Sequence, residues 1–179
     1  MASRNQDEVI DAYIVSTSSL STASFAMLVF FTILSVLGTF VSSVMIQRLD
    51  CIGSVYSAVP TLLIVMFLMV VAAKSFRIHM IPRIVKFRTE AVTNFMLKDP
   101  EYKKTPSSQK YRLLSSKLNQ VVDAESVNFS IFYNCSLYVG LYFILSFIVF
   151  SQLQPGVNFV FSSIGSSVVV YLMAVSAAK

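Results

Sequence analysis

The chain has 179 residues, of which 55% are hydrophobic and 13% are charged, and its formal net charge is +5. Soluble domains carry about a quarter charged residues, so the composition excludes an ordinary soluble domain and indicates a membrane protein. Charge is absent from three long stretches, which cover residues 12–47, 51–73 and 126–178.

The N-terminal segment, residues 1–23, is polar and contains three acidic residues. A cleavable signal peptide would begin with basic residues and have a shorter apolar core. We therefore expect the first apolar helix to remain in the protein as a membrane anchor.

Four transmembrane helices are predicted from the apolar runs. A bilayer core of about 30 Å needs about 20 apolar residues in a helix, and "SQLQPG" at residues 151–156 divides the third uncharged stretch into two. The runs are continuously apolar and exceed the roughly ten residues of a barrel strand. We place the helices at about 24–46, 52–73, 131–150 and 157–176. The expected fold class is an all-α membrane protein with four transmembrane helices and a cytosolic helical hairpin between helices 2 and 3.

The distribution of basic residues predicts the orientation in the membrane. Residues 74–125 hold eleven of the fourteen Lys and Arg residues, whereas the turn between helices 1 and 2 has only Arg48 and the turn between helices 3 and 4 has none. Lys and Arg close to a span stay on the cytosolic side, so we expect the central segment and both termini in the cytosol. The expected domains are a cytosolic N-terminal segment (1–23), transmembrane helices 1 and 2 (24–73), a basic cytosolic helical hairpin (74–126), and transmembrane helices 3 and 4 (127–179).

The central segment has the pattern of two paired helices. A helix continuing from the second span is expected to be kinked or interrupted at Pro82. Residues 99–107, with two prolines and mixed charge, form the expected turn. The apolar residues at helical spacing on either side are Ile84, Phe87, Ala91 and Phe95 before the turn, and Tyr111, Leu114, Leu118 and Val121 after it. Two such helices bury their stripes best against each other, which predicts an antiparallel hairpin.

The hairpin segment carries eleven basic and five acidic residues, a net charge of +6. Lys74 and Arg77 are close enough to the bilayer to feel anionic lipid, whose field fades within about 8 Å. If the hairpin stands upright, the tip bases lie beyond that field and need another polyanion, of which RNA is the largest at a cytosolic membrane face. The candidate RNA-binding residues are Arg83, Lys86, Arg88, Lys98, Lys103, Lys104, Lys110, Arg112 and Lys117.

Two other interpretations of the charge stay open at this point. If the hairpin lies flat, anionic lipid accounts for all of the basic residues, and Phe87 and Phe95 dip into the headgroups. Alternatively, the basic loop is only a topology signal on a small helical bundle. The matching apolar stripe on the second helix favours the upright arrangement.

The sequence contains no pattern typical of an active site. His79 is the only histidine, and there is no metal-ligand cluster, nucleophile motif or Gly-rich phosphate loop. We therefore predict a non-enzymatic protein without catalytic residues, cofactor or metal. Tyr138 and Tyr142 are interpreted as ordinary packing or lipid-facing aromatics. A small four-span transporter or channel is an alternative, but it needs polar groups inside the spans, and these offer little beyond Ser, Thr and Asn134.

A specific signal occurs at "AESVNFSIFYNCSLY", residues 124–138, and it resembles the gamma subunit of the translocon-associated protein complex, also called the signal sequence receptor complex. That family enters its third span with a similar run, matched here by Phe129–Asn134. A Pro-x-Val-Asn turn is matched by Pro155–Asn158, and a Ser-rich fourth span with a terminal Lys follows. "RTEAV", residues 88–92, is a weaker match. The hairpin departs from the family in being shorter and less densely charged.

The resemblance implies a multi-pass protein of the endoplasmic reticulum membrane that joins the other subunits of the complex beside the Sec61 channel. It implies that the cytosolic domain touches the translating ribosome near the tunnel exit, through ribosomal RNA and protein, and so assists co-translational translocation. Membrane lipids are the remaining expected partner. A basic hairpin suits a phosphate backbone, where Lys and Arg give position and salt-sensitive affinity without reading sequence.

Overall fold

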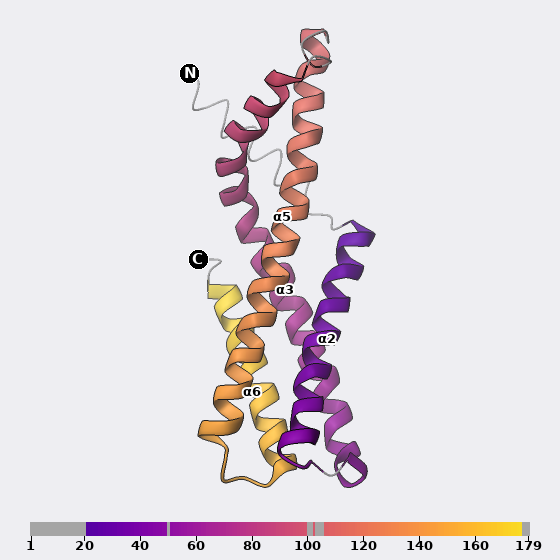
Figure 1. The fold of residues 1–179 in the computed structure, drawn as a ribbon, viewed down its shortest axis with the longest axis vertical. Coiled ribbons are helices and arrows are strands. Elements are labelled where there is room, and N and C mark those ends of the chain that lie inside the picture. Colours follow the sequence, from indigo (N-terminus) through magenta and orange to yellow (C-terminus); the bar gives the residue numbers. More distant parts are fainter. Residues whose placement is uncertain (1–20, 50, 100–101, 103–105, 177–179) are drawn as a thin grey trace. The chain divides into compact units, whose positions relative to one another are not determined.

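Figure 1 shows the computed structural model of the chain, which describes residues 21–49, 51–99, 102 and 106–176. The elements in chain order are α2 (Thr22–Ile46), α3 (Cys51–Lys98), α5 (Ser107–Ile144), the π-helical segment η1 (Leu145–Val149) and α6 (Pro155–Ser176). The described residues contain no strand. The structure thus confirms the all-α fold class.

Four helical stretches are long and apolar enough to cross a membrane. They are Thr22–Ile46, Tyr56–Lys98, Arg112–Val149 and Pro155–Ser176. The number of predicted transmembrane helices is therefore confirmed. Two of these stretches extend well beyond the roughly 20 residues that a bilayer core requires, because α3 and α5 also form the two arms of the hairpin.

The chain divides into two compact units, and α3 and α5 contribute to both. The bundle unit comprises Phe25–Phe76 together with the chain from Ser130 onward. The hairpin unit comprises Arg77–Phe129 and the beginning of α2 as far as Ser24. Each unit has its own apolar core.

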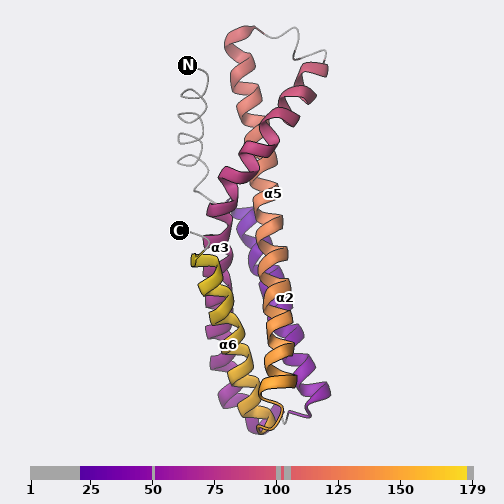
Figure 2. The same cartoon turned by 90° about the vertical axis from the view of Figure 1, so that its left-hand side faces the viewer.

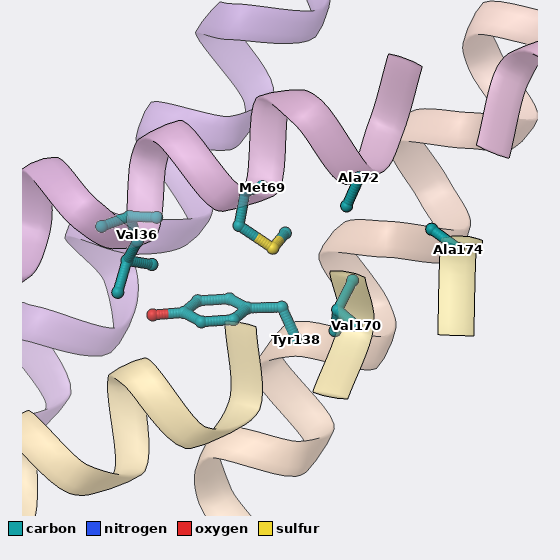
Figure 3. Close-up of a cluster of buried hydrophobic side chains, with 7 residues drawn as sticks. Val36, Met69, Ala72, Tyr138, Val170 and Ala174 are labelled. Carbon is teal, nitrogen blue, oxygen red and sulfur yellow. The ribbon is translucent and has the colours of Figure 1, made fainter. Parts of the chain in front are cut away.

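The core of the bundle unit lies where its four helices meet (Figure 3). Tyr138 of α5 is surrounded by Val36 of α2, Met69 of α3 and Val170 of α6, and all four side chains are buried. Small residues complete the cluster, since Ala72 and Ala174 face it as well. Small side chains let membrane helices approach closely and gain packing energy where water supplies no hydrophobic driving force.

A line of polar side chains, which we call the polar seam, runs inside the bundle unit between α2 with the residue after it, Gln47, and α5 with the following segment η1. The Tyr138 hydroxyl lies 3.2 Å from Thr39 Oγ1, the Tyr142 hydroxyl is hydrogen-bonded to Ser43 Oγ, and Gln47 Nε2 donates to Ser146 Oγ. Tyr138 and Tyr142 are both fully buried. The interpretation of these tyrosines as packing residues is confirmed, and the lipid-facing alternative is wrong. The sequence pattern missed their hydroxyl partners, which lie on another helix.

The turn between α5 and α6 differs in detail from the sequence expectation. α5 passes into η1, where the Phe150 N–H bonds to the Leu145 carbonyl at 2.8 Å, a π-helical spacing. The Asn158 side-chain amide donates to the Ser146 carbonyl at 3.0 Å. α6 begins at Pro155, two residues earlier than predicted, because the fixed φ of proline suits a first helical residue.

The hairpin unit consists of the second part of α3 packed against the first part of α5 (Figure 2). Ile81, Ile84 and Val85 of α3 form a buried cluster with Leu118 and Val122 of α5. The structure therefore confirms that the central segment folds as a helical hairpin. The two arms diverge toward the tip in Figure 2.

Of the two effects expected of Pro82, a kink or an interruption, the interruption is wrong, because the helix runs unbroken from Cys51 to Lys98. The helical phase set before Pro82 therefore continues after it. Ile81, Val85 and Val92 follow on one face, and this face contacts α5. Since the phase is not reset, the predicted stripe is rotated away from the interface. Ile84 and Leu118 were predicted correctly as buried, whereas Phe87, Ala91 and Phe95 are exposed.

Candidate polyanion-binding surface

Six of the predicted RNA-binding residues are exposed on the two helices of the hairpin unit, and we call the five without an ion pair to Glu125 the basic surface. The basic surface consists of Arg83, Lys86 and Lys98 on α3, and Arg112 and Lys117 on α5. Lys103 and Lys104, the other candidates near the tip, lie outside the described residues. The long helical arms explain the spread of these charges, because residues 83–98 alone extend over about 24 Å of helix.

Two further candidates already have partners within the hairpin unit. Arg88 Nε donates to Glu125 Oε2 at 2.8 Å, and this hydrogen bond, with the attraction between the two charges, raises the pKa of Arg88. Lys110 is half-buried, and its Nζ lies 5.7 Å from the centre of the Tyr102 ring, a cation–π contact. Arg88 and Lys110 are therefore less available to an external anion than the basic surface.

Arg77 differs most from the sequence expectation. Its side chain is buried and forms an ion pair with Asp123 of α5, while Ser24 at the start of α2 donates to the other carboxylate oxygen of Asp123 at 3.2 Å. A fully buried guanidinium that is paired with Asp123 does not offer its charge at the protein surface, and the expected influence of anionic lipid on Arg77 stays a prediction. Lys74 is exposed, and its Nζ lies 4.7 Å from the centre of the Phe25 ring.

Large aromatic side chains are exposed on the same helix as part of the basic surface. Phe87 is 81% exposed and Phe95 is 72% exposed. Arg83 and Phe87 are four residues apart and therefore lie on one face of α3. Exposed apolar area on this arm therefore lies beside its positive charge. The sequence pattern did not predict this combination, because it placed both phenylalanines in the stripe expected to be buried between the two helices.

The chemistry that this surface supports is electrostatic. Exposed Lys and Arg side chains neutralise phosphates and release counterions, which gives affinity that falls with salt and carries no sequence information. The described residues contain no group of three or more His, Cys, Asp or Glu that can hold a metal ion. His79 is half-buried on α3.

Together, the fold and this surface define a class: a multi-pass helical membrane protein with a hairpin that carries most of the basic residues of the chain. Comparison with protein-family models gives a match over residues 6–176 to the family described as translocon-associated protein, gamma subunit (TRAP-gamma). The chain belongs to this family. It is therefore a translocon-associated subunit and a multi-pass protein of the endoplasmic reticulum membrane, in a family of accessory subunits that are not known as enzymes.

Proposed function

We propose that the basic surface of the hairpin contacts the ribosome on the cytosolic side of the membrane. In this proposal the hairpin and both termini are cytosolic, and the ribosomal ligand is RNA together with large-subunit protein near the tunnel exit. The subunit holds the translating ribosome beside the Sec61 channel and so supports co-translational translocation. This role extends the translocon association that the family match establishes.

The observation that carries the proposal is the division of charge on the hairpin. Asp123 and Glu125 are engaged by Arg77 and Arg88 within the hairpin unit, so these two acids do not neutralise the basic surface. Its five bases stay exposed on both arms of the hairpin. Positive charge that is spread along both arms suits the repeated negative charge of a phosphate backbone.

Co-sedimentation of the solubilised complex with ribosomes, measured across a salt series, tests the proposal. Replacing Arg83, Lys86, Lys98, Arg112 and Lys117 by Glu should weaken binding and reduce the log–log salt slope by roughly 0.7–0.9 for each phosphate that is no longer neutralised. The matched control exchanges Arg88 and Glu125 for each other, which preserves the net charge. Unchanged binding by the five-residue variant would remove the basic surface from the mechanism.

A second candidate function is supported by the exposure of Phe87 and Phe95. Aromatic side chains beside basic residues also suit a helix that lies in the headgroup region of an anionic membrane. Replacing both phenylalanines by Ala separates the two candidates. Loss of binding to phosphatidylserine vesicles with retained ribosome binding supports a lipid surface for these residues, whereas loss of ribosome binding alone places them in the ribosome interface.

A further inference from the structure

A cavity of about 470 Å³ opens in the bundle unit, where the turn between α2 and α3 meets the turn between α5 and α6. Figures 1 and 2 both show these two turns side by side at the same end of the bundle unit. Apolar side chains of α6 form one part of the wall, namely Val157, Val160 and Phe161. Arg48, Ser57 and Gln154 are its polar lining residues. The volume is within the range of about 300–1,000 Å³ that is typical of small-molecule sites.

The cavity lies at the ends of two of the helices that are long and apolar enough to cross a membrane. α2 ends at Ile46 and α6 begins at Pro155, and the cavity is lined by residues directly adjoining these two ends. Membrane-spanning helices end where the hydrocarbon gives way to headgroups. A ligand in this cavity therefore has apolar acyl chains on one side and polar headgroups on the other.

Arg48 occupies a backbone position that glycine usually fills. The Gln47 and Leu49 N–H groups both bond to the Ser43 carbonyl, at 3.1 and 3.3 Å, and Arg48 has a φ of 55°. This arrangement is a helix C-terminal cap with a left-handed residue, where glycine is favoured because it has no Cβ. Leu49 is buried directly after it. An arginine in this conformation suggests a use for its side chain.

The charge of Arg48 is also unusual for its location. It is the only Lys or Arg between residues 12 and 73, and the segment 126–178 contains none. Most of the positive charge belongs to the hairpin, so a single guanidinium at the opposite ends of the spans is not explained by topology. Guanidinium groups bind phosphate with two parallel hydrogen bonds, which a lysine does not reproduce.

We propose that this cavity binds a phospholipid of the adjoining leaflet. The phosphate diester lies against the Arg48 guanidinium, Ser57 and Gln154 supply hydrogen bonds near the glycerol, and one acyl chain lies over Val157, Val160 and Phe161. Asp50, the nearest acidic residue in the sequence, lies outside the described residues. Its influence on the site is therefore included in the test.

Native mass spectrometry of the full chain in detergent, titrated with phosphatidylcholine or phosphatidylserine, tests the proposal. Arg48→Gly removes the guanidinium and suits the left-handed backbone, so the variant should fold at least as well as the parent chain. Because the variant loses the charge-assisted hydrogen bonds to the phosphate, it should bind lipid roughly tenfold or more weakly. The lipid affinity of Arg48→Lys should lie between those of Arg48→Gly and the parent chain. Equal lipid retention by Arg48→Gly and the parent chain overturns the proposal.

The apolar wall has a matched control on the same helix. Phe161 and Leu172 are 56% and 57% exposed, but only Phe161 lines the cavity. Phe161→Ala should weaken lipid binding and Leu172→Ala should not. Equal losses would show a non-specific lipid shell and overturn the proposal.

Asp50→Asn should leave phosphatidylserine binding equal or stronger, and a loss would contradict an anion-binding role for Arg48. Inorganic phosphate should not displace the lipid, whereas full displacement would show a free-phosphate site instead.

Discussion

Arg77 is the only Lys, Arg, Asp or Glu side chain that is fully buried in the described part of the chain. Its ion pair with Asp123 connects the two arms of the hairpin unit, and Ser24 brings the start of α2 to the same carboxylate. Removing two charges from water is costly, and a buried pair holds only when further hydrogen bonds satisfy it. We therefore expect this cluster to contribute structural specificity, by fixing which turn of α3 faces which turn of α5.

A double-mutant cycle on this pair is the prediction at the residue scale. Arg77→Met and Asp123→Leu should each lower the thermal stability of the solubilised chain, with a coupling energy of about 0.5–3 kcal/mol. The pair Arg88 and Glu125 joins the same two helices at an exposed position, and its cycle should show much weaker coupling because solvent screens the charges. Additive effects at Arg77 and Asp123 would contradict the structural role.

At the scale of the element, α3 retains its helical phase across Pro82. Proline lacks the N–H that would bond to the Ile78 carbonyl, so Pro82→Ala should restore one hydrogen bond. We expect a higher melting temperature and slower amide hydrogen exchange over residues 82–86. Pro155→Ala is the control, because Pro155 is the first residue of α6 and no intrahelical donor is missing there. Faster exchange in the Pro82→Ala variant would show that the proline favours this helix.

The same phase determines which apolar residues of α3 stabilise the hairpin. Ile84 is 6% exposed in the cluster with Leu118, whereas Phe87 is 81% exposed. Ile84→Ala should lower the free energy of unfolding of the hairpin by about 2–5 kcal/mol. Phe87→Ala should change it by less than about 0.5 kcal/mol, as at most surface sites. Chemical denaturation followed by proteolysis of the hairpin measures both, and a larger effect at Phe87 would contradict the observed packing.

The number of spans and the presence of a hairpin were predictable because length and apolar continuity alone determine them. The exposed faces of the hairpin helices were not predictable. Residues on α3 form two possible apolar stripes, and which of them is buried against α5 depends on whether the helix continues through Pro82. The exposure of the candidate site residues Arg83 and Lys98 follows from their charge. The burial of Arg77, which was not a candidate site residue, depends on Asp123, which is 46 residues away. Residue spacing within one helix does not show which side chain of another helix will be its partner. The ion pair between Arg88 and Glu125 could therefore not be predicted either.

At the scale of the whole molecule, the proposed orientation predicts opposite accessibility of two positions. In a chain without its two native cysteines, cysteine introduced at Lys98 on the hairpin should react with a membrane-impermeant maleimide in sealed microsomes. Cysteine introduced at Leu153, in the turn between α5 and α6, should react only after permeabilisation. The asymmetry follows from the eleven basic residues between the second and third spans. The reverse labelling pattern would invert the topology.

The hydroxyl groups of the bundle unit have a consequence for how this chain enters a lipid bilayer. Many of them bond to a carbonyl one turn earlier in their own helix, as Thr32 does to Leu28 at 2.9 Å, Thr61 to Ser57 at 2.7 Å and Ser166 to Ser162 at 2.7 Å. Such a hydroxyl already has a hydrogen bond within its own helix when it enters the hydrocarbon, and it needs no partner from a neighbouring helix. Each span can thus leave the insertion machinery singly, whereas the hydroxyls of the two buried tyrosines depend on partners from another helix.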